Sequence, residues 1–325
     1  MKIQACSPDG GAFKYILDGL GNSFRAAGHE FRNVQKVTND FDLYLGCSGW
    51  RQDIPRKSDR RGKVGIHVNP YGPRKVGSVD GGPVIDEPKK AIEWTLQQKP
   101  DFVYCYCSDT FIPEYYGYYT SRHGIPVVSM STAADITVYK PQPKNPEFAC
   151  DIGWVGGYWP YKAHMLDPYL VPLLKLHKCK IYGWGGWQKF IGRNFSIDDN
   201  KVASLFSTAK ICPSISEPHT RVFPVDVPER VFKVPAAGGF TIHTPSPAVS
   251  DLFGDVIPMA KNPTEWYKLI RHYLANNDER EYMAGRQRSL ILRKHTYFDR
   301  ACGIADVIGR PGLRTALEDA KEKLI

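Results

Sequence analysis

The segment PERVFKVPAAGGFTIHT (Pro228–Thr244) predicts a helix that is followed directly by a strand. Its first half carries helix-compatible residues, its end FTIHT is rich in β-formers, and Gly238–Gly239 lie at the junction. The helix would begin with Arg230, where the helix dipole disfavours a cation. Glycine is the usual residue at a helix end. Alternatively, the helix start meets an anionic ligand, which the arginine then helps to bind.

The same alternation of strands and helices extends in both directions from this segment. Strands are predicted at MKIQAC, EFRNVQ, FDLYLGCSG, KVGIHVN, DFVYCYC and IPVVSM, and again from DIGWVGG onward. Strands that alternate with helices are typical of parallel α/β sheets. A proline-rich segment, Tyr139–Phe148, interrupts the alternation and predicts a linker.

We therefore expect two doubly wound, Rossmann-like α/β domains that face each other across a cleft. The expected ranges are 1–140 for the first domain, 141–300 for the second domain, and 301–325 for a helical tail that crosses back to the first domain. Ligands of such sheets bind at the carboxyl ends of the strands.

Composition excludes several classes of protein. The 325 residues carry a net charge of +9 and eight scattered cysteines, without the spacing of a zinc site. No apolar stretch approaches the ~20 residues of a membrane span, and the first residues do not resemble a secretory signal. We expect a cytoplasmic protein with reduced thiols, and no metal site.

Three glycine-rich turns follow predicted strands. They lie at Ser7–Phe13, which contains Gly10 and Gly11, at Trp154–Lys162, which contains Gly156 and Gly157, and at Tyr182–Trp187. Such turns are often only structural, but Lys162 and Arg230 nearby favour a nucleotide phosphate. Trp184 and Trp187 would flank its base.

The second half resembles a known family. DIGWVGG, KIYGWGGW, LFSTAKICPSIS, ERVFKVPAAGGFTIHT and the segment from His272 to Arg300 occur in this order. They resemble CgeB-type, spore-maturation-like glycosyltransferases, which are related to retaining family-four transferases of the GT-B fold. The resemblance covers Ser131–Arg300 and is thin before it. It implies a glycosyltransferase whose co-substrate is a nucleotide sugar, UDP-linked, with no other cofactor.

By this resemblance, Arg230 and Lys162 neutralise the donor diphosphate, and Gly238–Gly239 let the helix pack closely on its strand. The family usually has Arg-x-Phe-Glu where this chain has Lys233 as the fourth residue. A lysine cannot accept hydrogen bonds from ribose hydroxyls. Glu217 and Asp226 are the acidic candidates for the sugar or the ribose, or they are solvated loop residues.

The catalytic candidates lie in the first domain. His67 ends a predicted strand, where the superfamily has a histidine that touches the transferred sugar; a buried core histidine is the alternative. Asp9 is a second candidate and would suit an inverting mechanism, which needs a base for the acceptor hydroxyl. Retention and inversion both remain open. No metal is expected, because lysine and arginine can stabilise the leaving diphosphate.

A basic segment between two strands of the first domain suggests the acceptor. It contains Arg51, Arg56, Lys57, Arg60, Arg61 and Lys63. A solvated loop explains such a segment, but so does a polyanionic acceptor. We expect a hydroxylated or hydroxymethylated pyrimidine in duplex DNA, flipped out of the stack. Alternatives are a cell-envelope, spore-polysaccharide or teichoic-type acceptor, a non-catalytic nucleotide-binding relative, and a nucleotide-sugar epimerase.

Overall fold

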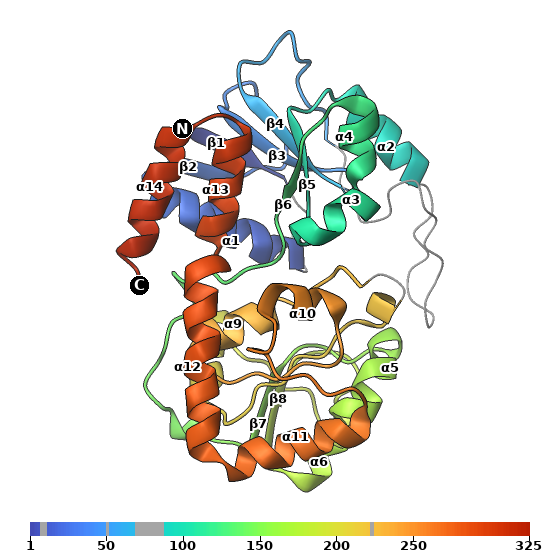
Figure 1. Ribbon diagram of the computed structural model, residues 1–325, viewed down its shortest axis with the longest axis vertical. Helices are drawn as coiled ribbons and strands as arrows, with labels where there is room; N and C mark the ends of the chain where they lie inside the picture. Colours follow the sequence, from blue (N-terminus) through green and yellow to red (C-terminus); the bar gives the residue numbers. More distant parts are fainter. Residues whose placement is uncertain (7–11, 50–51, 69–87, 222–223) are drawn as a thin grey trace. The chain divides into compact units, whose positions relative to one another are not determined.

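The chain folds into two compact α/β units (Figure 1). The computed structural model describes residues 1–6, 12–49, 52–68, 88–221 and 224–325. Unit 1 comprises the described parts of Met1–Gly77 and Val84–Thr137 together with Thr296–Ile325, and unit 2 comprises Val138–His295. The sequence places the boundaries at residues 140 and 300. In the structure, Thr296–Arg300 belong to unit 1, because Thr296 caps the helix that follows and Tyr297 N donates to Ala134 O (3.0 Å).

Unit 1 is built on a parallel sheet of six strands in the order β2-β1-β3-β4-β5-β6. All six predicted strands are present: β1 Lys2–Ala5, β2 Glu30–Asn33, β3 Leu43–Cys47, β4 Lys63–His67, β5 Phe102–Cys105 and β6 Val127–Ser129. Every residue of β3 and β5 is buried. Strands buried on both faces are typical of parallel sheets that helices cover on both sides.

Helices cover both faces of this sheet. On one side lie α1 (Ala12–Ala26), α13 (Tyr297–Val307) and α14 (Pro311–Glu322), and on the other α2 (Pro88–Gln97), α3 (Ile112–Tyr115) and α4 (Gly117–His123) (Figure 1). A short 3₁₀ helix, Asp109–Phe111, precedes α3. The strand order reverses between β1 and β3, the position at which ligands bind in sheets of this kind. The glycine turn after β1, with Asp9, Gly10 and Gly11, lies outside the described residues.

Unit 2 has a parallel pair, β7 (Ile152–Val155) and β8 (Cys179–Tyr182), which further extended segments continue. Backbone bonds join Gly153 N to Ile211 O, Cys212 N to Phe240 O, and His243 N to Pro258 O, each 2.9 Å long. The segments predicted as strands at ICPSIS, FTIHT and DVIPMA therefore lie in the sheet, but they pair only through isolated bridges. Pro213 and Pro258 lack the N–H group that a continuous ladder requires.

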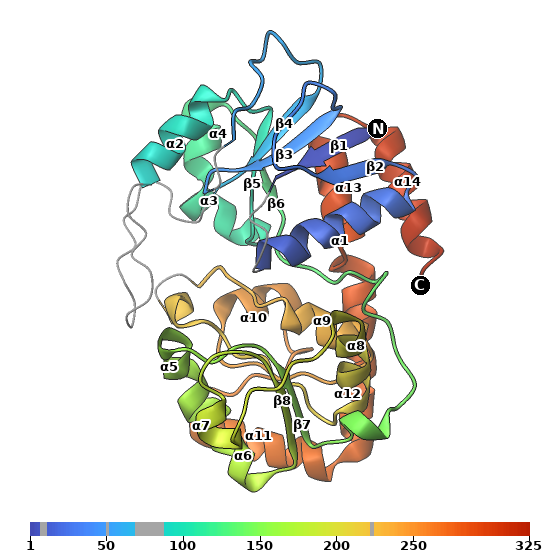
Figure 2. The same ribbon diagram turned by 180° about the vertical axis from the view of Figure 1, so that it is seen from behind.

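Helices surround β7 and β8 in unit 2 (Figure 2). They are α5 Pro160–Tyr169, α6 Leu173–Leu176, α7 Gln188–Ile191, α8 Asp199–Thr208, α9 Arg230–Ala236, α10 Pro247–Phe253, α11 Pro263–Ala275 and α12 Asn277–Lys294, with 3₁₀ turns at Pro146–Phe148 and Pro218–Arg221. The core contains the fully buried Trp154, Trp187 and Trp266. All eight cysteines are free thiols. In the part of the chain that the structure describes, no helix is long and apolar enough to cross a membrane.

Candidate functional site

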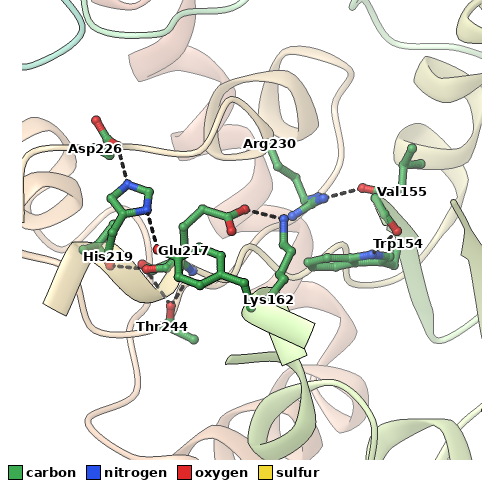
Figure 3. A network of polar contacts seen from close by, with 12 residues as sticks. Trp154, Val155, Lys162, Glu217, His219, Asp226, Arg230 and Thr244 are labelled. Carbon is green, nitrogen blue, oxygen red and sulfur yellow. Dashed lines mark hydrogen bonds and ion pairs between the residues drawn. The ribbon is translucent and has the colours of Figure 1, made fainter. Parts of the chain in front are cut away.

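Two cations converge at the carboxyl end of β7 in unit 2 (Figure 3). Arg230 is the first residue of α9, and its Nη2 donates to the carbonyl of Val155, the last residue of β7. Its guanidinium carbon lies 3.6 Å from the centroid of a Trp154 ring. Burial lowers the pKa of Arg230 to about 10, which leaves it charged at neutral pH. The arginine is thus held between a carbonyl and an aromatic face.

Lys162 lies in the first turn of α5, which begins with Pro160, a residue favoured at that position. Its side chain is only 10% exposed and forms an ion pair with Glu217. The ammonium lies 5.0 Å from the centroid of a Trp159 ring. Burial lowers the pKa of Lys162, Glu217 opposes this shift, and the charge of Arg230 adds to it. Lys162 is thus a nearly buried cation that lies close to a second cation.

The charge of this cluster does not balance. Among the described residues, Glu217 is the one carboxylate that forms an ion pair with either Lys162 or Arg230. Buried charges are costly unless they are paired. A site with two cations and one carboxylate is therefore suited to an additional anion, and an arginine and a lysine together are typical ligands of phosphate.

A histidine extends the cluster on the other side of Glu217. His219 Nε2 lies 2.5 Å from Asp226 Oδ2, and Nδ1 lies 3.1 Å from the hydroxyl of Tyr161 (Figure 3). Asp226, a predicted ligand of the donor, is therefore engaged with His219. His219 and Tyr161 were not predicted from the sequence. The aromatic residues of YWPYK, which ends at Lys162, are a sequence signal that could have identified Tyr161. In EPHTR, no sequence feature indicates that His219 binds Asp226.

The glycine turns after β7 and β8 are locked together. Gly156 O accepts hydrogen bonds from the indoles of Trp154 (3.1 Å) and Trp187 (2.8 Å). A Cβ on Gly183 would lie 2.1 Å from the same carbonyl oxygen, and one on Gly156 would lie 3.0 Å from Arg230 Nη2. These glycines are needed because two backbone segments and a guanidinium meet at one place.

The two predicted base-flanking tryptophans have different positions. Trp187 is fully buried in the core, and its N–H is bound to Gly156 O, so it has no face to offer a ligand. Trp184 is 63% exposed and stacks on Trp159, with ring centroids 4.9 Å apart and planes 6° apart. A Cβ on Gly157 would lie 2.6 Å from the Trp184 ring. The exposed platform is thus Trp184 on Trp159, a partner that was not predicted.

Lys233 and the glycine pair of α9 have structural contacts. Lys233 Nζ lies 2.6 Å from Glu229 Oε2, one turn earlier, and both side chains are nearly buried. Gly238 ends the helix with a φ of +76°, and a Cβ on Gly239 would lie 2.3 Å from Phe206 O. The close approach at Gly239 is thus to the carbonyl of Phe206 near the end of α8, and the predicted close packing of the helix on its own strand stays a prediction.

His67 ends β4 inside an aromatic cluster of unit 1. It is 2% exposed, its ring stacks on Tyr106 with centroids 4.1 Å apart, and its Nδ1 lies 3.5 Å from Cys47 Sγ. Burial lowers its pKa to about 3, so the imidazole is neutral at physiological pH. This geometry is that of the core histidine named above as the alternative. A contact with a sugar stays a prediction.

The basic segment of unit 1 is divided between surface and structure. Arg56, Lys57, Arg61 and Lys63 are exposed, whereas Arg60 is 9% exposed. The Arg60 guanidinium donates to Lys99 O (2.9 Å), and more weakly to Gln98 O, at the end of α2. It satisfies carbonyls that a helix end leaves unpaired. The expectation that Arg60 contacts the acceptor is therefore not supported, and Arg51 lies outside the described residues.

Within the described ranges, no group of three or more His, Cys, Asp or Glu side chains is arranged to hold an ion.

Comparison with known proteins shows that most of unit 2 is similar to glycosyltransferases. Residues 164–306 match the Glycosyl transferase-like family. No curated protein matches the chain. This family match spans α5 through α13 and includes Glu217, His219 and Arg230.

Solved structures with the same fold cover nearly the whole chain. Sucrose-phosphate synthase from Thermosynechococcus elongatus has a TM-score of 0.60 at 11% identity and covers 96% of this chain and 99% of its own. Anabaena HepE in complex with UDP has 0.59 at 11%, with coverage of 95% and 100%. T4 phage BGT in complex with its UDP-glucose substrate has 0.53 at 11%, with coverage of 98% and 99%. The chain therefore has the GT-B fold of these structures, and its residues 164–306 are similar to glycosyltransferases.

Proposed function

We propose that this protein transfers a sugar from a UDP-linked nucleotide sugar to a hydroxyl acceptor, and that unit 2 binds the donor. The observation that carries the proposal is the pair of cations, Lys162 and Arg230, at the carboxyl end of β7, whose two charges face the single carboxylate of Glu217. A diphosphate supplies the negative charge that the cluster lacks. The Anabaena and T4 phage structures that share the fold contain UDP or UDP-glucose.

The other donor contacts follow from the same geometry. The exposed face of Trp184, backed by Trp159, suits stacking with the base. Without a ligand, Glu217 forms an ion pair with Lys162. When a phosphate binds Lys162 in its place, the Glu217 carboxylate becomes available to accept hydrogen bonds from sugar or ribose hydroxyls. Lys233, which is paired with Glu229, is not proposed as a ribose ligand.

The donor proposal is tested by calorimetry with UDP-glucose, and with uridine, which has no phosphate. We expect Arg230→Gln to weaken the binding of UDP-glucose about 10- to 150-fold, the worth of a charge-assisted hydrogen bond, and to leave the weak binding of uridine unchanged. Arg280→Gln is the matched control, because Arg280 is also a buried arginine of unit 2 that donates to a backbone carbonyl, that of Tyr273. Equal affinity of Arg230→Gln and wild type for UDP-glucose would refute the diphosphate site.

Transfer itself is tested without assuming an acceptor. A purified glycosyltransferase hydrolyses its donor slowly in the absence of acceptor, whereas an epimerase interconverts the sugar and a non-catalytic relative does neither. Mass spectrometry of several UDP-sugars after incubation separates these outcomes. The anomeric configuration of a transferred sugar then decides between retention and inversion, and with it whether a base such as Asp9 is needed.

For the acceptor we propose duplex DNA that carries a hydroxylated or hydroxymethylated pyrimidine. The support is the exposed basic segment of unit 1. Lys57 and Lys63 share Asp101, at 3.9 and 3.1 Å, and the nearby Arg56 and Arg61 add further charge. These side chains would contact phosphates without reading the sequence. A cell-envelope or teichoic-type polymer is the second candidate, since the same charges attract any polyanion.

The acceptor proposal is tested with Arg56, Lys57 and Arg61 changed to glutamine and Arg60 retained. If the segment binds DNA, the plot of log affinity against log salt becomes shallower by up to ~0.9 per lost phosphate contact. UDP-glucose affinity should not change. A slope equal to that of the wild type, with hydroxymethylated or plain DNA, would exclude this segment as a DNA contact. The resemblance to CgeB-type enzymes and a cytoplasmic location also stay predictions.

A further inference from the structure

His219 is a titratable group with a fixed orientation next to the proposed diphosphate site. Both ring nitrogens are engaged: Nε2 with Asp226 at 2.5 Å and Nδ1 with the Tyr161 hydroxyl at 3.1 Å. The His219 and Tyr161 rings are parallel within 3°, with centroids 6.5 Å apart. Contacts on both nitrogens prevent the ring from rotating freely.

This histidine is tied to the cation cluster on two sides. Tyr161 directly precedes Lys162 on α5, and Glu217, the partner of Lys162, lies two residues before His219 (Figure 3). Among the described residues, the titratable and charged groups that face His219 are therefore Tyr161 and Lys162 from α5, and Glu217 and Asp226 from its own loop. An anion that binds Lys162 would enter the electrostatic surroundings of the imidazole.

Opposing contributions from burial and from the neighbouring charges set the pKa of His219. Burial and the charge of Lys162 lower the pKa of His219. The hydrogen bond and charge of Asp226, together with the charge of Glu217, raise it and outweigh them, so the pKa of His219 lies above its usual value. The usual histidine pKa is about 6.5. The protonation of His219 therefore depends on the charges beside it, and an additional anion at Lys162 raises its pKa further.

We propose that Tyr161, His219 and Asp226 form a proton-linked part of the donor site, in which His219 takes up a proton when the diphosphate binds at Lys162 and Arg230. The inference rests on the proposed function and assigns His219 as a third cation of the same site. The proton comes from solvent, and the product is an imidazolium that donates from Nε2 to Asp226 and from Nδ1 to Tyr161. In the neutral ring with its proton on Nε2, Nδ1 instead accepts from the Tyr161 hydroxyl. The hydroxyl thus changes from donor to acceptor with respect to the histidine.

The size of the effect follows from linkage. If the diphosphate raises the pKa of His219 by about one unit, binding at low pH is about tenfold tighter than binding at high pH. At the pH midway between the free and bound values, about 0.5 proton is taken up per ligand bound. Since the charge of Asp226 stabilises the imidazolium, its removal should lower the free and the bound pKa of His219 and move the proton uptake to lower pH.

UDP-glucose is the suitable probe, because its diphosphate has no proton that titrates near neutral pH, so any proton uptake comes from the protein. Calorimetry at several pH values on both sides of neutral, each in buffers of different ionisation enthalpy, gives the number of protons bound. We expect uptake in the wild type, none from this site in His219→Gln, and uptake at lower pH in Asp226→Asn. The affinity of His219→Gln should also lose its tenfold dependence on pH.

A matched control is available in unit 2. His272 Nε2 lies 2.7 Å from Glu279 Oε2, in an exposed pair of α11 and α12. His272→Gln should take up as many protons as the wild type. NMR of ¹⁵N-histidine-labelled protein adds a direct readout, in which the His219 pKa rises by about one unit with UDP-glucose.

The outcomes separate the two proposals. If UDP-glucose does not bind, the proposed function fails and this inference fails with it. If UDP-glucose binds and Arg230→Gln weakens it, but His219→Gln takes up as many protons as the wild type, the donor site stands and the role of His219 is refuted. An unchanged NMR pKa of His219 in the complex would refute it as well.

Discussion

Replacement of Lys162 by methionine provides a quantitative test of the donor site. Methionine retains most of the aliphatic length that packs in unit 2 and removes the ammonium. The lost interaction is a charge-assisted hydrogen bond to phosphate, worth about 1.5–3 kcal/mol, or an affinity about 10- to 150-fold lower. Because the Lys162 side chain is only 10% exposed, little of this is lost to solvent screening.

The same substitution leaves Glu217 without its partner. Breaking a buried ion pair on one side costs about 3–5 kcal/mol, whereas replacing both partners with neutral residues is often neutral. Glu217 is more exposed than Lys162, 28% against 10%, so we expect a cost at or below the lower end of that range. We therefore predict that Lys162→Met lowers the free energy of unfolding by about 2 kcal/mol, and that adding Glu217→Gln recovers most of it. Adding Glu217→Gln should not restore the binding of UDP-glucose.

Calorimetry gives the affinity, and urea unfolding gives the stability. Lys210→Met is the control, because Lys210 forms an exposed pair with Asp151 (2.8 Å) in the same unit and should change neither quantity by more than ~0.5 kcal/mol. An affinity of Lys162→Met within twofold of the wild type would refute the assignment of the phosphate site. Recovery of affinity along with stability in the double variant would show that Lys162 acts only through folding.

Three further predictions concern other parts of the chain. Trp184→Ala should weaken UDP-glucose binding about fivefold by removing about 1 kcal/mol of stacking, as measured by calorimetry. Ala in place of the similarly exposed Tyr282 of α12 should leave the affinity unchanged, and equal effects of the two substitutions would exclude the Trp184 platform. Arg60→Ala should lower the free energy of unfolding by about 1–3 kcal/mol, because carbonyls at the end of α2 lose their hydrogen-bond donor. Arg61→Ala should lower it by less than ~0.5 kcal/mol. If urea unfolding showed the larger loss for Arg61→Ala, the structural role of Arg60 would be contradicted. His67 and His243, with pKa values lowered by burial to about 3 and about 4, stay neutral in the folded protein while the unfolded chain takes up protons below about pH 6.5. The free energy of unfolding should therefore fall as pH drops below 6.5, by up to ~1.4 kcal/mol per pH unit for each histidine. In urea unfolding between pH 6 and 4.5, the free energy of unfolding of His67→Phe should fall less steeply with pH than that of the wild type. An equal pH dependence would contradict a neutral, buried His67.

The sequence alone determined the fold class and the charged ligands of the proposed site. The strand and helix patterns of unit 1 are local, since β3 and β5 are short runs of apolar residues between turns, and all six strands were found where they were predicted. Arg230 was singled out because a cation at a helix start conflicts with the dipole, and the structure shows what holds it there: Val155 O and the face of Trp154. Strand and helix patterns, and residues that conflict with them, depend on neighbouring positions and can therefore be recognised in the sequence alone.

Only the tertiary structure decided which of the candidate residues come together. Trp184 and Trp187 differ by three positions, yet one is exposed and the other lies in the core, where its N–H donates to the carbonyl of Gly156 in the turn after β7. Arg60 has the same charge as Arg61, but the end of α2, nearly forty residues later, takes up its guanidinium. His219 meets Tyr161 across a separation of 58 residues. Hydrogen bonds and packing between distant segments depend on how the sheet brings strand ends together, and a pattern of neighbouring residues does not contain that information.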